Sequence, residues 1–149
     1  MLRSALDTNV LAYAEGVNGS AMANTAWELI ARLRGSSTFL PAQVVGELFH
    51  LLVRKAGRSP KQVHGALMNW QDAFPVIETS QPVLLAALDL AVRHRLRIWD
   101  SLVMAAAASA SCRLLLSEDL HDGFTWNGVT VVNPFAPKPN ALLAQLLDS

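Results

Sequence analysis

The sequence predicts an α/β fold, in which helices flank a central sheet of short and mostly parallel strands. Short apolar runs of strand length alternate along the chain with longer stretches in which apolar residues recur every three or four positions. The runs at 113–117 and 128–132 are almost continuously apolar, which is typical of parallel strands buried on both faces. A chain of 149 residues, of which 52% are hydrophobic, is long enough for one packed core, so we expect a single domain over 1–149.

Turn and capping residues separate the expected elements. Asp7 or Thr8 is suited to cap the first helix, and Ser59-Pro60 combines an N-cap residue with proline at the first helical position. Gly57 is a natural end for the helix before it. In chain order we expect a strand over 2–6, helices over 8–15 and 20–34, a strand over 38–40, helices over 42–56 and 60–74, a strand over 75–78, helices over 79–96 and 98–112, strands over 113–117 and 128–132, and a helix over 140–148.

The composition excludes several classes of protein. Lys and Arg number 12 and Asp and Glu number 12, so the chain carries no strongly basic surface for nucleic acid. One cysteine, Cys112, allows neither an internal disulfide nor a cysteine-built zinc site. No apolar run reaches the ~18 residues of a membrane span, and an acid at position 7 comes too early for a signal peptide. We therefore expect a cytoplasmic protein without a membrane partner.

Four acidic residues stand where solvated charges are not expected. Asp7 follows the first strand, and Asp119 lies two residues beyond the strand that ends at Ser117. Asp100 lies at the start of an alanine-rich helix, and Glu47 lies within the apolar stripe of its helix. Helix capping, an ordinary turn or a buried salt bridge could each explain one of them. Because ligands of open parallel sheets bind beyond the carboxyl ends of the strands, we expect the four to converge there.

Carboxylates that share a pocket repel one another, and a bound cation stabilises them. They raise one another's pKa values, and a divalent ion removes this conflict. Oxygen donors without histidine or cysteine favour Mg²⁺, with Mn²⁺ as a possible substitute, over zinc. A carboxylate-held Mg²⁺ is suited to phosphate chemistry, and it attracts a phosphate backbone although the net charge of the chain is zero. One or two ions would fit this pattern equally well.

Five segments resemble the motifs of PIN-domain nucleases, in the same order and at similar spacing. They are Leu6 to Ala14, Val45 to Leu48, Ile98 to Leu102, Leu115 to Leu120 and Val131 to Phe135. The resemblance spans nearly the whole chain, and its compact length is most similar to the VapC-type toxins of bacterial toxin–antitoxin pairs. It implies a PIN-like three-layer sandwich.

The resemblance also implies a Mg²⁺-dependent endoribonuclease that leaves 5′-phosphate and 3′-hydroxyl ends. Matched residue by residue, Asp7, Glu47, Asp100 and Asp119 fall on the acidic quartet that holds the metal. The loop after the fourth strand offers a further acid, Asp122, which could share or replace the role of Asp119, or belong to a plain turn before Gly123.

Three polar residues and three partners follow from the same resemblance. Thr8 and Asn9 fall on the polar pair beside the first aspartate, and Ser117 takes a place usually held by threonine or serine, so we expect all three to help position the substrate. The implied partners are RNA, a second copy of the chain in a homodimer, and a cognate antitoxin whose tail lies in a groove near the site. The helices expected over 8–15 and 20–34 are candidates for the antitoxin contact.

Other functions remain open at this point. The acids could serve a non-catalytic metal- or RNA-binding module, a metal-dependent DNA nuclease or a phosphatase. A phosphatase of the haloacid-dehalogenase type requires a second acid two positions after the first, where this chain has Asn9.

Basic and aromatic residues suggest where RNA could be held. The basic residues within 54–61 and within 93–97 could contact phosphates, although both clusters also fit an ordinary solvated surface. Trp27 and Trp70 lie on or beside apolar stripes and are expected in the core, whereas Trp99 adjoins the third acid and is the tryptophan best placed to stack on a base.

Overall fold

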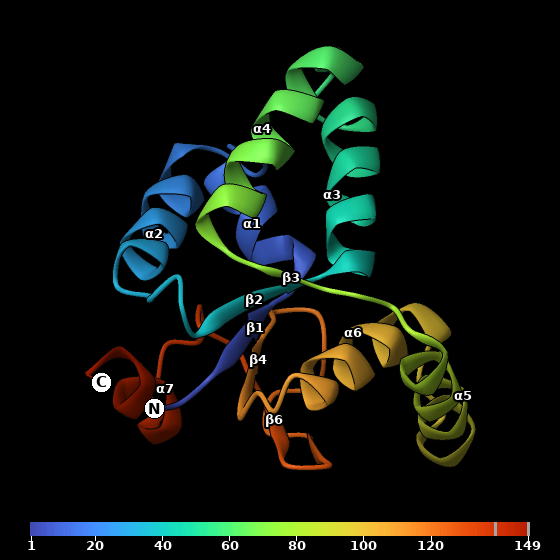
Figure 1. The fold of residues 1–149 in the computed structure, drawn as a ribbon. Coiled ribbons are helices and arrows are strands. Elements are labelled where there is room, and N and C mark those ends of the chain that lie inside the picture. Colours follow the sequence, from blue (N-terminus) through green and yellow to red (C-terminus); the bar gives the residue numbers. More distant parts are fainter. Residues whose placement is uncertain (139, 149) are drawn as a thin grey trace.

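The computed structural model describes residues 1–138 and 140–148, and its strands form one mostly parallel sheet (Figure 1). Within these residues the sheet has six strands in the order β3-β2-β1-β4-β6-β5. The strands are β1 (Ser4–Leu6), β2 (Thr38–Pro41), β3 (Val76–Ile77), β4 (Leu114–Leu116), β5 (Thr125–Trp126) and β6 (Val129–Val132). All neighbouring pairs among them are parallel except β5 with β6. The predicted α/β class is confirmed.

Helices cover both faces of this sheet (Figure 1). Their bounds are α1 (Thr8–Ala14), α2 (Ser20–Ala31), α3 (Ala42–Arg54), α4 (Pro60–Ala73), α5 (Gln81–His94), α6 (Ile98–Ser109) and α7 (Ala141–Leu147). Helices α1 to α4 lie on one side, α6 packs against β2, β4 and β6 on the other, and α5 lies outside α6. The arrangement is the expected three-layer sandwich. Among the helices described, none is both long and apolar enough to span a bilayer.

Apolar burial explains why α6 and β4 pack so closely. All three leucines of β4 are fully buried, as the continuous apolar run predicts. Helix α6 buries every residue from Ser101 to Ala107, and the last three of these are alanine. Small side chains allow the helix axis to approach the sheet, so the start of α6 is held firmly beside the carboxyl ends of the strands.

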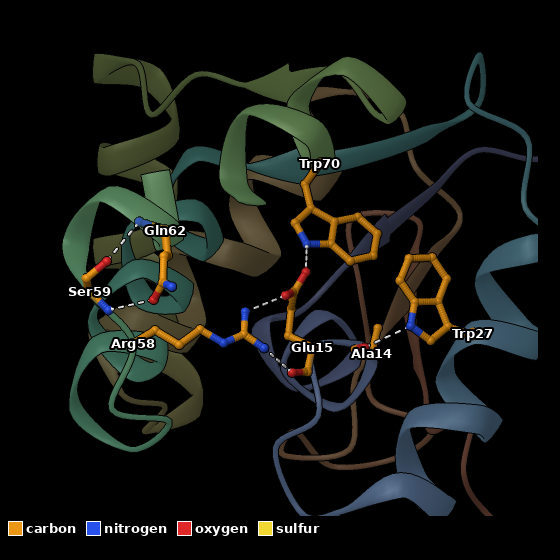
Figure 2. Close-up of polar contacts among 7 residues, drawn as sticks. All are labelled: Ala14, Glu15, Trp27, Arg58, Ser59, Gln62 and Trp70. Atoms are coloured by element: carbon orange, nitrogen blue, oxygen red, sulfur yellow. Dashed lines mark hydrogen bonds and ion pairs between the residues drawn. The ribbon is translucent and has the colours of Figure 1, made fainter. Parts of the chain in front are cut away.

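Capping residues set the helix starts as predicted. Asp7, rather than Thr8, is the N-cap of α1, and its carboxylate accepts the Thr8 N–H at 2.8 Å. Ser59 and Gln62 form a reciprocal capping box at the start of α4, with both distances 3.2 Å (Figure 2).

The hairpin of β5 and β6 was not predicted. Its turn residues Asn127 and Gly128 have φ values of 46° and 82°, as a tight type I′ hairpin turn requires. The Asn-Gly pair was the sequence signal for this hairpin. Helix α2 ends at Ala31, before the expected end at 34, and α3 ends at Arg54 instead of 56.

A polar cluster ties the end of α1 to the α3–α4 hairpin, which comprises residues 42–73 (Figure 2). Arg58 donates to the Glu15 carboxylate at 2.6 Å and also to the Glu15 backbone carbonyl. The Trp70 indole N–H donates to the second Glu15 oxygen at 2.8 Å. We call these three residues the Glu15 latch, because Glu15 joins two separate parts of the chain.

The two tryptophans beside this latch differ in burial. Trp70 is buried, as predicted. Trp27, which was also expected in the core, is instead 47% exposed, and its ring stacks on Trp70 with centroids 5.2 Å apart. Its indole N–H donates to the Ala14 carbonyl at 2.8 Å, so the ring is held beside Trp70 of the latch (Figure 2).

Candidate active site

Four acids from separate elements face one edge of the sheet. Asp7 follows β1 and Asp119 follows β4, and these parallel strands are neighbours whose last residues pair in register. Glu47 lies on α3, which begins directly after β2, and Asp100 lies in the first turn of α6. Both Glu47 and Asp119 raise the pKa of Asp7, and Asp119 also raises the pKa of Asp100. The four carboxyl groups therefore influence one another electrostatically.

Asp7 is the buried member of the set. It is 6% exposed, and its two oxygens accept the Thr8 N–H at 2.8 Å and the Ser117 hydroxyl at 2.6 Å. Burial raises its pKa to about 6, and the neighbouring carboxylates add to this rise, while the two hydrogen bonds oppose it. Asp7 has no cationic partner within 4.0 Å in the described part of the chain.

Ser117 holds two acids in place. Its side chain is fully buried, and its hydroxyl donates to Asp7 and accepts the N–H groups of Asp119 at 3.2 Å and Leu120 at 3.3 Å. We expected Ser117 to position substrate. Its contacts in the structure are with the acids themselves, so it organises the loop that carries Asp119.

Glu47 is the member of the set that α3 contributes. It is half-buried, and its carboxylate accepts the Gln43 amide at 3.1 Å and, at a longer 3.4 Å, the Thr8 hydroxyl. None of the ion pairs among the described residues includes Glu47. The buried salt bridge considered for this residue is therefore absent from the described part of the chain.

Asp100 and Asp119 complete the set. Asp100 is half-buried and is not the N-cap of α6, a position that Arg97 occupies. Burial raises the pKa of Asp100, the Arg97 guanidinium opposes this effect, and Asp119 adds to it. Asp119 is exposed. The Arg97 charge therefore reaches the acidic set from the start of α6.

Asn9 presents an unused donor beside these acids. The residue is 8% exposed, and its side-chain oxygen accepts the Glu118 N–H at 3.2 Å. Its Nδ2 is buried and has no hydrogen-bond partner among the described residues. Since buried donors are normally paired, this amide is suited to a ligand oxygen.

Asp122 has a different environment. Its carboxylate accepts the Asn133 N–H at 3.0 Å, and Gly123 has a φ of 91°, so the pair belongs to a turn. Asp122 makes no contribution to the pKa shifts of Asp7 or Asp100. These observations favour Asp119 as the fourth acid.

The donor set fits a hard divalent cation. Among the described residues no three His, Cys, Asp or Glu side chains are grouped closely enough to hold a metal ion outright. All the candidate donors are nevertheless carboxylate oxygens, which Mg²⁺ and Mn²⁺ prefer. A divalent cation would also compensate the charge of Asp7, which is buried without a cationic partner.

A cavity of about 900 Å³ opens beside this acidic set, and we call it the Glu47 groove. One wall is formed by α3 and the other by the residues around the start of α6. The lining residues include Thr8, Glu47, His50, Arg54, Lys55, Arg97 and Trp99. The groove thus joins two of the predicted site residues to basic and aromatic side chains.

Two contacts of the site were not predicted. Gln43 binds Glu47 from four positions earlier on α3, a spacing that places side chains on the same helix face and was visible in the sequence. The Tyr13 hydroxyl donates to the Glu118 carboxylate, which raises the pKa of Tyr13 to about 12. No spacing rule connects residues so far apart, so this second contact required the fold.

Comparisons with known proteins agree with this architecture. VapC20 of Mycobacterium tuberculosis is 20% identical, with 78% of this chain and 91% of that chain covered and a TM-score of 0.63. A toxin–antitoxin complex from Klebsiella pneumoniae and FitAcB from Neisseria gonorrhoeae are each 19% identical, with 89% of this chain and 98% of the other chain covered. Their TM-scores are 0.67 and 0.65. A search among curated proteins finds no match. The PIN domain model matches residues 5–121, so this chain belongs to the PIN domain family, as its motifs predicted.

Proposed function

We propose that this chain is a Mg²⁺-dependent endoribonuclease and the toxin of a type II toxin–antitoxin pair. The observation that carries the proposal is the acidic set, in which Asp7, Glu47, Asp100 and Asp119 come from four elements and couple electrostatically at one edge of the sheet. Membership of the PIN domain family supports it, as do similar structures described as toxins or toxin–antitoxin complexes.

The four acids would hold Mg²⁺, or Mn²⁺ in its place. When bound, such an ion polarises the phosphodiester and makes a water molecule acidic enough to attack it. The protein contributes orientation. The free Nδ2 of Asn9 donates to a phosphate oxygen, and Arg97 supplies positive charge at the end of the groove that reaches Asp100.

Cleavage of RNA with and without divalent metal tests the proposal. Asp7→Asn and Asp100→Asn should each lower the cleavage rate by more than the ~10–100-fold that outer-shell partners of a metal contribute. Asp122→Asn, which changes an acid used in a turn, should keep most of the activity and serves as the matched control. Wild-type rates in both the Asp7 and Asp100 variants would contradict the assignment.

The same preparation separates the alternative functions. A single-stranded DNA of the same sequence tests for a DNA nuclease, and a phosphate monoester tests for a phosphatase. RNA binding without any cleavage would indicate a non-catalytic module. The substrate panel should include ribosomal RNA, because the VapC20 structure is described as that of a toxin that cleaves the sarcin–ricin loop.

The toxin role has its own test. Expression of the chain in bacteria should arrest growth, and co-expression of the protein encoded by the neighbouring reading frame should restore it. Asp7→Asn should abolish the arrest. Helix α1 is buried along its whole length and offers no broad surface to an antitoxin, which leaves α2 as the remaining candidate of the two helices we considered.

A further inference from the structure

The Glu47 groove extends from the acidic set and is larger than one catalytic site requires. It contains Thr8 and Glu47 at the acids and reaches Arg54 along α3. Its volume of about 900 Å³ lies near the upper end of the ~300–1,000 Å³ usual for ligand sites. A polynucleotide whose reacting phosphate lies at the acids could therefore continue into the same groove.

The charges in the groove differ from those of the whole molecule. The chain is neutral overall, whereas the described lining residues include three cations, Arg54, Lys55 and Arg97, and one acid, Glu47. None of the three cations takes part in an ion pair within the described residues. By contrast, Arg58 and Arg93, which belong to the same two basic clusters, are paired with Glu15 and Asp89. Arg54, Lys55 and Arg97 are thus unpaired cations that line the groove, whereas Lys61 and Arg95 of the same clusters are also unpaired in the described part of the chain but do not line it.

Trp99 lines the same groove as these cations and is the sequence neighbour of Asp100. It lies on α6 and is 51% exposed. Within the described residues its ring stacks on no other aromatic side chain and its indole N–H has no partner. The indoles of Trp27 and Trp70 are both hydrogen-bonded and stacked on each other. Trp99 therefore offers a free aromatic face.

We propose that Trp99, with Arg97, Arg54 and Lys55, forms a binding subsite for single-stranded RNA next to the cleavage site. One base stacks on the Trp99 ring, and the three cations bind the phosphates on either side of it. This assignment rests on the proposed nuclease function. It adds that the substrate is single-stranded at this subsite, and it names the residues that bind it.

The exposed Trp99 ring favours unpaired RNA over duplex RNA. Bases in a duplex already stack on their neighbours, so a tryptophan gains a base only from a single strand, a loop or a bulge. The subsite is therefore expected to prefer unpaired RNA, with little preference for a particular base because every base has an aromatic face.

Binding without cleavage tests the subsite separately from catalysis. A fluorescein-labelled, short single-stranded oligoribonucleotide of mixed sequence is titrated in EDTA with wild-type protein, Trp99→Ala, Trp99→Leu and Trp99→Phe, and anisotropy gives the Kd. We expect Kd to rise about 10-fold for Ala and Leu and clearly less for Phe, which keeps an aromatic face. The same strand in a duplex should bind weakly and respond little to these substitutions.

The cations have a matched control in Arg93, which is exposed on α5, paired with Asp89 and outside the groove. Arg97→Ala and Arg54→Ala should each reduce the slope of log K against log salt by about 0.7, as for one lost single-strand phosphate contact, and Arg93→Ala should leave the slope unchanged. In cleavage assays Trp99→Ala should raise KM about 10-fold and leave kcat near the wild-type value.

Several outcomes would overturn the subsite. One is a Kd for single-stranded RNA that does not change in Trp99→Ala, and another is an equal loss of RNA affinity in the Phe and Ala variants. A third is conversion of a dimer to a monomer by Trp99→Ala, which would make Trp99 a contact between copies. Cleavage by wild-type protein together with unchanged Kd rejects the subsite and keeps the nuclease. Trp99-dependent binding without any cleavage rejects the nuclease instead.

Discussion

Asp7 is a carboxyl group in surroundings that disfavour its charge. Burial raises its pKa to about 6, whereas an Asp in an unfolded chain titrates near ~3.9. Between these two values the folded protein holds a proton that the unfolded chain has lost. Protonated Asp7 therefore contributes stability that is fully present below about pH 4 and is lost as the pH rises through about 6.

This shift predicts how the metal-free protein responds to pH. The free energy of unfolding should lose about 2 kcal/mol between pH 4 and 7 through Asp7, since each pKa unit corresponds to about 1.4 kcal/mol and an unfolded Asp is already partly ionised at pH 4. Asp7→Asn cannot ionise, so its stability relative to wild type should rise over that interval. Urea unfolding in EDTA across this range measures the difference, and parallel curves for the two proteins would contradict it.

Ser117 provides a second prediction about a single residue. Ser117→Ala removes a hydroxyl that donates to Asp7 and accepts two backbone N–H groups, and it leaves buried polar groups unpaired. We expect a loss of about 1–3 kcal/mol in unfolding free energy and reduced cleavage, because Asp119 loses its anchor. Ser117→Thr keeps the hydroxyl and should preserve much of both. Thermal unfolding and RNA cleavage of the two variants, measured side by side, check this.

The positions of the acids could be predicted from the sequence, but their contacts could not. Asp7 and Asp119 follow strands, and the rule that parallel strands share one edge places them together whatever the side-chain details. The role of Ser117 depends on a hydrogen bond to a residue 110 positions away, which no local pattern records. The half-buried position of Glu47 depends on where α3 docks, which the apolar stripe alone does not record.

At the level of elements, the Glu15 latch fixes the α3–α4 hairpin, whose first helix, α3, forms one wall of the groove. Arg58 and Glu15 are partly buried, with side-chain exposures of 31% and 16%, so solvent screens their attraction less than that of a surface pair. Because Arg54 and Lys55 lie just before Arg58 in the chain, the latch also restrains the cations at the end of α3.

Weakening the latch should therefore destabilise the fold. Glu15→Gln removes the charge that pairs with Arg58 and is expected to cost about 1–2 kcal/mol in unfolding free energy. Arg58→Met combined with Glu15→Gln should cost less than the sum of the single changes, because the two residues interact directly. Denaturant unfolding of the three variants gives the coupling energy, and additive costs would rule out the latch as a unit.

Element types were easier to predict than element ends. Apolar spacing identified α2, α3 and α4, because burying one face of a helix requires it, and capping residues and composition indicated the other helices. The ends of α2 and α3 were placed two or three residues too late, since apolar spacing continues beyond the last helical residue. The strand β5 has only two residues and forms through its pairing with β6. The Asn-Gly turn was therefore the sequence signal that could have predicted it.

At the scale of the whole molecule, α5 leaves one apolar face uncovered. It packs on α6 through Val83, Ala87 and Leu90, while its outer side lies at the edge of the sandwich (Figure 1). The large apolar residues exposed on it are Leu84, Leu85, Leu88 and Val92. Apolar residues exposed at this helical spacing mark an interaction surface, and we propose that it forms the homodimer contact implied by the sequence resemblance.

The dimer can be tested on this stripe. The double variant Leu85→Glu and Val92→Glu replaces side chains that are 58% and 80% exposed in the protomer, so the fold should tolerate it. In a two-fold dimer the new charges would face one another or be desolvated, which costs several kcal/mol and should convert dimer to monomer. Sedimentation velocity over a range of concentrations measures the change, with circular dichroism to confirm the fold.

Met68→Glu is the matched control for that experiment. Met68 is 46% exposed and lies on α4, on the opposite side of the sheet from α5, so its substitution should leave the dimer intact (Figure 1). A wild-type protein that sediments as a monomer at every concentration would refute the homodimer. A dimer that survives the α5 double variant but dissociates with Met68→Glu would instead place the interface on the face formed by α1 to α4, and the exposed stripe of α5 would then need another partner.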